Sequence, residues 1–286
     1  MRIHTLCIIG VGAIGGSLAR ALREANACRH IIGCGRQQRN LEKAVALGVI
    51  DEFETDVAKA VAGADMIVLT VPLGAMETVF RAMVNKIAPN AVITDGGSAK
   101  RTVLTQARSA FGEIPKNLVP SHPIAGTEKS GVEASSRLLF QDRSVIITPV
   151  AETDPTALAR VRAMWEAVGA NVAEMDAARH DKILAATSHL PHVLAYTMVN
   201  VLQEMEEGSA ILRYAAGGFR DFSRIASSDP QMWTDICLAN GDAIVAMLDH
   251  FGTRLESIIG AIRRGEGDSI KALFTRAKQY RDMQYH

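Results

Sequence analysis

The stretch Gly10-Val11-Gly12-Ala13-Ile14-Gly15 decides the fold, because it follows the apolar run Ile3 to Ile9 and leads straight into a helix-forming stretch. A GxGxxG motif between a first strand and a first helix is typical of dinucleotide-binding domains. Gly10 permits the tight turn, Gly12 lets the backbone approach a pyrophosphate, and Gly15 lets helix and strand pack closely. The helix N-terminus adds the positive end of its dipole. We therefore expect a dinucleotide at Gly10, Gly12, Ala13, Ile14 and Gly15.

Beyond this motif, short apolar and β-branched runs alternate with helix-like stretches, which indicates a parallel sheet covered by helices. After Ile3 to Ile9 the runs are Ile31 to Cys34, Met66 to Val71, Ala91 to Thr94, Ser144 to Thr148 and, following a helix at 154–168, Asn171 to Met175. From Asp176 onward the chain is rich in alanine, leucine and methionine at helical spacing, as at 177–205, 232–251 and 255–264. We predict an α/β fold with a Rossmann-type, doubly wound parallel sheet in residues 1–175 and an all-helical domain in residues 176–286. The apolar helices of the second domain favour a homodimer formed through it.

The composition narrows the classes of partner. The 286 residues include 31 Lys plus Arg against 31 Asp plus Glu, so the chain has no electrostatic reason to bind nucleic acid or an anionic membrane. A small-molecule substrate is the expected partner. The four cysteines form no CxxC pair and are interpreted as reduced thiols. No run reaches the roughly 18 apolar residues of a membrane span, and we expect a cytoplasmic protein.

The end of the second strand bears on the choice of cofactor. It reads Gly33-Cys34-Gly35-Arg36-Gln37-Gln38-Arg39, without the acid that NAD enzymes usually place there for the ribose hydroxyl. Arg36 and Arg39 can pair with a 2′-phosphate, so we expect NADP, with NAD as the alternative if both are only surface charges. Val71 and Pro72, at the end of another strand, are also expected to contact the cofactor.

Three polar segments interrupt otherwise apolar sequence. The first is Asp95-Gly96-Gly97-Ser98-Ala99-Lys100, and the second runs from Ser121-His122-Pro123 to Gly131. Both follow sheet strands, where loops at the carboxyl edge form the ligand crevice, so both should face the nicotinamide. The third is split between Ser188-His189-Leu190-Pro191-His192 and the segment 217–226, which reads GGFRDFSRIA.

Together these motifs resemble the prephenate/arogenate dehydrogenase family, in the family's order and from Ile3 to about Arg264. The resemblance implies oxidative decarboxylation of prephenate or arogenate with hydride transfer to a nicotinamide, giving 4-hydroxyphenylpyruvate or tyrosine. It does not separate the two substrates.

The resemblance also implies roles for single residues. His122 corresponds to the catalytic histidine that takes the proton of the substrate's ring hydroxyl, a role that suits a neutral imidazole. Ser98 corresponds to the active-site serine, which holds that hydroxyl or orients His122, unless it only caps a helix near Lys100. Arg224 corresponds to the carboxylate-binding residue, unless it only pairs with Asp221. His192, His189, Glu128 and Asp221 complete the expected substrate-binding set, and His180 and Trp233 match residues that line or support it.

The sequence also allows other interpretations of the site and of the function. His189 and His192 would share a face of a helix, but no Cys, Asp or Glu at suitable spacing accompanies them, so we expect no zinc site. A β-hydroxyacid dehydrogenase would use a lysine base such as Lys182, which leaves the His122 segment unexplained. A non-catalytic module that senses NADP would bind the cofactor without turnover.

Overall fold

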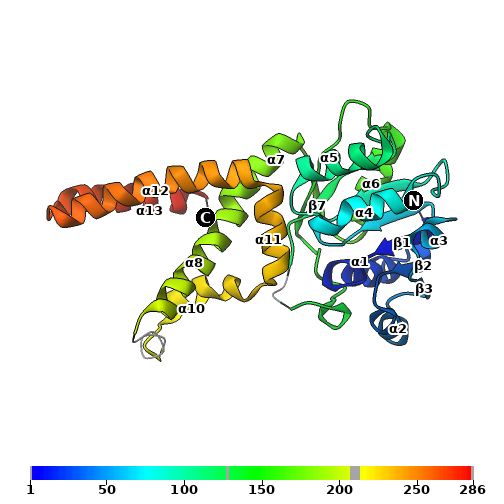
Figure 1. Cartoon of the computed structure of the whole chain (residues 1–286), viewed down its shortest axis with the longest axis horizontal. Coiled ribbons are helices and arrows are strands. Elements are labelled where there is room, and N and C mark those ends of the chain that lie inside the picture. The colour runs from blue at the N-terminus through cyan, green and yellow to red at the C-terminus, as the bar shows by residue number, and fades with distance from the viewer. Residues whose placement is uncertain (1, 127–128, 207–212, 285–286) are drawn as a thin grey trace. The chain divides into compact units, whose positions relative to one another are not determined.

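The computed structural model describes residues 2–126, 129–206 and 213–284, and the chain forms two compact units. The first unit is residues 1–241 and contains every strand of the described chain; the second is residues 242–286. Figure 1 shows the strands of the first unit together with the helices around them.

The central sheet has six parallel strands in the order β3-β2-β1-β4-β5-β6. Their bounds are β1 Ile3–Ile9, β2 Cys28–Cys34, β3 Glu52–Glu54, β4 Met66–Leu69, β5 Val92–Asp95 and β6 Leu118–Val119. The strand order reverses beside β1, which is the arrangement of a doubly wound dinucleotide-binding fold and confirms the prediction. β3 and β6 have three and two residues, too few to produce a periodic signal in the sequence.

Alternate residues of β1 show why helices cover both faces of this sheet. Leu6 and Ile8 belong to one buried cluster, and Cys7 and Ile9 belong to the other. Residues of α1 (Ala13–Glu24) and α6 (Pro155–Ala167) fill the first cluster. Residues of α3 (Val57–Val61), α4 (Leu73–Met83) and α5 (Lys100–Phe111) fill the second. α2 (Gln38–Ala46) adds Leu41 and Ala44 to the first cluster.

One expectation about the sheet is corrected. The strands predicted at 144–148 and 171–175 do not extend the parallel sheet but form a second, three-stranded sheet, β7-β8-β9. It consists of β7 (Ser121–Pro123), β8 (Ser144–Ile147) and β9 (Asn171–Glu174), with β7 antiparallel to β8 and β9 parallel to it. Ser121-His122-Pro123 is a strand and not the expected loop; a three-residue strand with proline at its end gives no alternation of its own in the sequence.

In the described residues after β9 the chain is helical, as predicted, but its breaks differ. The elements are α7 Ala177–Leu184, a π-helical turn Ala185–His189, α8 Leu190–Glu204, α10 Gly217–Ser223, the 3-10 turn Arg224–Ser227, α11 Pro230–Ala239, α12 Gly241–Arg263 and α13 Gly267–Gln284. The stretch predicted at 232–251 is broken at Asn240, and α12 runs through the break expected before 255. None of the helices in the described ranges is both long and apolar enough to cross a membrane.

Candidate active site

The glycine motif forms the turn that the sequence predicts. Gly10 has φ +100°, and a Cβ there would lie 2.6 Å from the Thr70 carbonyl oxygen. A Cβ on Gly15 would lie 2.5 Å from the Gly10 oxygen, so strand and helix approach as closely as glycine allows. A Cβ on Gly12 would meet nothing within 4 Å, and Gly12 is the N-cap of α1, which has no side-chain cap and no acid in its first turn. This open, positive helix end suits a pyrophosphate.

Segments far apart in the sequence meet at the carboxyl edge of the sheet. A Cβ built on Gly96, just after β5, would lie 3.4 Å from Thr70, 3.6 Å from Ile14 and 3.7 Å from Pro123. The glycine motif, the end of β4 and the strand that carries His122 therefore converge there. Ligands of doubly wound sheets bind at this edge.

His122 begins a chain of buried hydrogen bonds that the sequence did not predict. On β7, it is 9% exposed, and its Nδ1 lies 2.9 Å from Nε2 of His180. Nδ1 of His180 lies 2.8 Å from Oδ1 of Asp181. Both partners stand on α7, where Asp176 caps the helix by accepting from the Arg179 amide. His180 is 0% exposed, so it packs in the core and supports His122 at the same time.

This chain determines which ring nitrogens carry protons. The carboxylate of Asp181 only accepts, so His180 Nδ1 donates to it and His180 Nε2 accepts. His122 Nδ1 must then donate to His180, which leaves His122 Nε2 with a free lone pair. A neutral imidazole held in this tautomer is a base at Nε2.

Asp181 also caps α5, in place of the residue the sequence suggested. Its Oδ1 and Oδ2 accept from the backbone amides of Lys100 (2.7 Å) and Arg101 (3.0 Å). The N-cap residue of α5 is Ala99, which has no side chain able to accept, so the interpretation of Ser98 as the cap is wrong. Burial alone would raise the pKa of Asp181, but the hydrogen bonds from His180, Lys100 and Arg101 lower it overall. Asp181 is therefore ionised at neutral pH.

A buried ion pair supports the strand that holds His122. Lys100 and Asp95 are both 0% exposed; the Lys100 ammonium bonds to Asp95 and donates to the Ser121 carbonyl at 2.6 Å. The Ser121 hydroxyl bonds to the Asp95 carbonyl at 2.5 Å and accepts from the Trp165 indole at 3.0 Å. Burial lowers the pKa of Lys100, whereas Asp95 raises it. Breaking such a pair leaves an uncompensated buried charge.

The helical side of the site adds two more histidines. The π-helical turn 185–189 carries His189, which is 0% exposed and lies 3.1 Å from the Asn240 amide nitrogen through its Nδ1. The same Asn240 nitrogen donates to the Asp181 carbonyl at 2.8 Å. His192 stacks on Trp233 with ring centroids 3.7 Å apart. π-helical turns often occur at functional sites.

Two buried N–H groups on this side lack a partner. Asn240 donates to His189 Nδ1, so the proton of His189 is on Nε2, and that atom has no hydrogen bond among the described residues. The indole nitrogen of Trp233 is also buried without one. Unsatisfied buried donors are costly, and a ligand with acceptor oxygens would satisfy them.

Burial lowers the pKa of all four residues of the histidine cluster, which we define as His122, His180, His189 and His192. The pKa of His189 falls to about 4. The pKa of His122 is lowered well below its usual range, first by burial and then by the charges of His180, Lys100 and His189. The cluster is therefore neutral at physiological pH, as a proton acceptor must be.

The other predicted substrate-binding residues are exposed or fall outside the residues that the structure describes. Arg224 and Asp221 are exposed, on the 3-10 turn 224–227 and on α10. The Tyr196 hydroxyl on α8 ties this region to the helix of His192 by donating to the Ser228 carbonyl at 2.6 Å. Glu128 lies outside the described residues. Lys182 is exposed, so the lysine-base alternative gains no support.

Both basic and acidic side chains lie at the adenosine end of the expected cofactor site. Arg36 and Arg39 are exposed after β2. Cys34, the last residue of β2, has its pKa raised to about 11 by burial and then by Glu54 and Asp56. Glu54 ends β3, the neighbour of β2, and Asp56 follows it; β3 is too short to be predicted from the sequence, so the position of these two carboxylates could not be predicted either.

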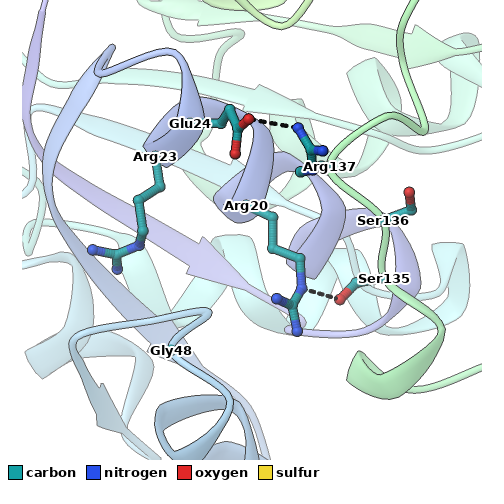
Figure 2. A pocket seen from close by; sticks show the side chains of 7 residues that line it. All are labelled: Arg20, Arg23, Glu24, Gly48, Ser135, Ser136 and Arg137. Carbon is teal, nitrogen blue, oxygen red and sulfur yellow. Dashed lines mark hydrogen bonds and ion pairs between the residues drawn. The ribbon is translucent and has the colours of Figure 1, made fainter.

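A surface cavity of about 580 Å³ lies elsewhere and contains no residue of the motifs. Figure 2 shows two bonds among the side chains that line it: Arg20 donates to Ser135 at 2.8 Å, and Arg137 bonds to Glu24. Arg23 pairs with Asp51. The bonds to Ser135 and Arg137 connect the segment after β7 to α1, and the Arg23–Asp51 pair connects α1 to the residue before β3, so the charged side chains at this cavity have a structural role.

A Rossmann-type sheet with a glycine motif at its edge, facing a buried neutral histidine, defines a nucleotide-dependent dehydrogenase. Family comparisons are more specific: residues 18–174 match the nucleotide-binding domain of prephenate dehydrogenase, and residues 176–276 match its dimerization domain. The chain belongs to the prephenate dehydrogenase family.

Individual relatives match nearly the whole chain. It is 38% identical to the cyclohexadienyl dehydrogenase of Zymomonas mobilis over 96% of this chain and 94% of that one. A solved structure of prephenate dehydrogenase from Aquifex aeolicus, in complex with hydroxyphenyl propionate and NAD+, has a TM-score of 0.91 and 34% identity, covering 99% of both chains. The arogenate dehydrogenase of Synechocystis has a TM-score of 0.80 and 27% identity, covering 98% of this chain and 99% of that one.

Proposed function

We propose that this enzyme oxidatively decarboxylates prephenate, arogenate or both, and that His122 is its base. The observation that carries the proposal is the Asp181–His180–His122 chain, which directs a neutral Nε2 lone pair away from the buried network at the sheet edge. In the proposed reaction His122 Nε2 takes the proton of the ring hydroxyl. The carbon that bears this hydroxyl would give up its hydride, and a nicotinamide, when bound, would supply the acceptor for it. The ring carboxyl leaves as carbon dioxide, and the ring becomes aromatic.

The protein's own contribution is to position and polarise. The open backbone at Gly12 and the uncapped N-terminus of α1 would hold the pyrophosphate, with Ala13, Ile14, Val71 and Pro72 beside it. Holding the reacting carbon against the cofactor supplies proximity, and His122 relieves charge on the developing carbonyl oxygen. Ser98 is proposed to hold the substrate hydroxyl.

The substrate is an anion with two carboxylates, which the helical side is proposed to bind. His189 and Trp233 offer buried N–H donors that have no partner in the part of the chain that the structure describes, and His192 is fixed by its stacking on Trp233. Arg224, Asp221 and Glu128 are proposed to complete the pocket. We accordingly propose a division by function at residue 175, with 1–175 binding the cofactor and 176–286 binding substrate and forming the dimer. The matched family segments, 18–174 and 176–276, support this division.

NADP is the proposed cofactor, because Arg36 and Arg39 follow β2 where a 2′-phosphate would lie. Glu54 and Asp56 near Cys34 favour NAD instead, so the two must be compared directly. The test of the whole proposal measures nicotinamide reduction with prephenate and with arogenate, each against NADP+ and NAD+. We expect turnover of at least one substrate and a higher kcat/KM with NADP+. A tenfold preference for NAD+ would overturn the cofactor assignment, and no turnover with any pair would overturn the function.

Replacing Arg224 by alanine is expected to raise KM for the substrate by about tenfold or more, because a guanidinium binds a carboxylate bidentately. Arg224→Lys should recover part of the loss. The measurement is KM beside the dissociation constant of the cofactor, which should not change. Arg179→Ala, an exposed arginine on α7, is the control. Equal KM values for Arg224→Ala and the control would remove Arg224 from the site.

We also propose a homodimer in the cytoplasm, formed through the helical domain. α12 exposes Val245, Leu255, Ile259 and Ile262, and α13 exposes Phe274. Exposed apolar side chains in such number are typical of a protein–protein interface. Sedimentation at micromolar concentration should give the mass of two chains. A single-chain mass would contradict the proposal.

A further inference from the structure

Two helices that begin at the cofactor edge of the sheet are capped from far along the chain. The N-cap residue of α5 is Ala99 and that of α4 is Pro72, and neither makes a side-chain cap. Asp181 of α7 caps α5 instead. On α4 the equivalent partner is Asp235 of α11, whose Oδ2 accepts from the Gly74 amide at 3.0 Å. Asp181 also orients His180 in the proposed mechanism, whereas Asp235 has no part in the proposed proton transfer.

The contact between Asp235 and Gly74 depends on both residues. A Cβ on Gly74 would lie 2.9 Å from Oδ2 and 3.2 Å from Cγ of Asp235, so only glycine lets the carboxylate approach this closely. The other oxygen, Oδ1, accepts from the side chain of Gln231 at 2.8 Å, which orients the carboxylate. A charged acceptor at a helix N-terminus satisfies a free amide and interacts favourably with the helix dipole.

The helix turn that Asp235 caps directly follows residues that are expected to touch the cofactor. Val71 and Pro72 immediately precede the first turn of α4. Gln106 of α5 donates to the Leu73 carbonyl at 3.0 Å, so this turn is held from α5 through Leu73 and from α11 through Gly74. α11 is itself anchored, because Thr102 donates to the Ala239 carbonyl at 2.7 Å. In Figure 1, α11 lies between α8 and the strands.

We propose that Asp235 is a positioning residue for the nicotinamide cofactor: by capping α4 from the helical segment, it holds the Val71–Pro72 turn in its binding position. The inference rests on the proposed function, because it needs the cofactor to lie at this edge of the sheet. It assigns to α11 a contribution to the cofactor side in addition to Trp233, which stacks on His192.

The test measures the dissociation constants of NADP+ and NAD+ by titration calorimetry, without substrate, for the wild-type protein and its variants. Asp235→Ala should weaken binding of the preferred cofactor by about fivefold, the equivalent of losing one helix cap. Asp235→Asn keeps an oxygen that can accept from Gly74 and should bind within about twofold of wild type. In steady-state kinetics, KM for the cofactor should rise in Asp235→Ala while KM for the substrate and the pH profile of kcat stay unchanged.

Asp229→Ala is the matched control, because Asp229 caps α11 by accepting from the Met232 amide and, among the described residues, has no hydrogen bond to α4. If Asp235 only stabilises α11, both alanine variants will melt earlier and bind the cofactor equally well, and the inference is wrong. Gly74→Ala provides a second variant should Asp235→Ala not fold: its Cβ displaces the carboxylate, so combining the two substitutions should weaken binding no more than either alone. Additive effects would contradict the proposal.

The two proposals fail in different ways. A wild-type protein that binds neither nucleotide overturns the proposed function, and the inference with it. A wild-type protein that binds one of them, with the same affinity as Asp235→Ala, overturns only the role of Asp235.

Discussion

Replacing His122 by asparagine should lower kcat by a factor of about 10² to 10⁴, the usual contribution of a positioned general base. Asparagine fits the space and can still donate to His180, so the buried hydrogen bond at 2.9 Å has a replacement. What the variant loses is the Nε2 lone pair. The dissociation constant of the cofactor should be unchanged, since His122 is not part of the glycine motif.

The pH profile tests the same residue in a second way. A base works only when neutral, so kcat/KM must fall as the pH drops through the pKa of His122 in the free enzyme. Burial holds that pKa well below its usual range, so the profile should stay flat from neutral pH down past about 6.5, the ordinary value for histidine. An acid limb centred above that value, or wild-type turnover in His122→Asn, would show that another group is the base.

Replacing Asp181 by asparagine should have the second-largest effect, because this carboxylate serves two structures at once. Its oxygens accept from His180 and from the amides of Lys100 and Arg101. Asparagine has one accepting oxygen, and its NH2 group cannot accept from an N–H. One of the three hydrogen bonds is therefore lost, which removes either the cap of α5 or the donor-acceptor pattern that fixes the tautomer of His180. Where a carboxylate fixes a catalytic histidine directly, the same change costs about 10⁴ in kcat. Here one more histidine intervenes, and we expect a loss of about 10²-fold.

Stability should fall as well. Hydrogen bonds to a buried charged group contribute about 1.5–3 kcal/mol each, and losing one of them should lower the free energy of unfolding by about that amount. Urea denaturation and kcat should be measured together. Asp176→Asn is the control, since Asp176 is an exposed local cap of the same helix and should change neither by much. Lower stability with full turnover in Asp181→Asn would mean that Asp181 is only a cap.

Most of the fold could be predicted because its signals are local. The spacing of glycines after β1 and the apolar runs of β2, β4 and β5 are legible in a few residues each. β3, β6 and β7 escaped prediction because each has two or three residues, and their pairing depends on neighbours that the local sequence does not contain. For the same reason the second sheet was unexpected: β8 and β9 read as strands, but nothing local shows which strand they join.

The residues of the candidate site likewise fall into those with a local sequence signal and those without one. His122 and the glycine motif could be identified from the sequence, because each lies in a polar segment next to an apolar strand. Asp181 could not be distinguished from a surface acid, and Ser98 was an obvious but incorrect choice for the cap of α5. A missing local cap, alanine at 99 or proline at 72, was a signal that some other acceptor was needed. The missing caps did not reveal that Asp181 and Asp235 are the acceptors.

The sequence by itself determined the family, the dinucleotide turn and the identity of the expected base, since these depend on residue types at fixed spacing along the chain. Only the tertiary structure decided that His122 Nε2 is the free nitrogen, that Asp181 and Asp235 cap α5 and α4, and that Glu54 and Asp56 lie near the end of β2. A hydrogen bond depends on the positions of two atoms in space. Asp181 reaches Lys100 across 81 residues of chain, and that distance is closed by the packing of α7 on α5, which no local pattern records.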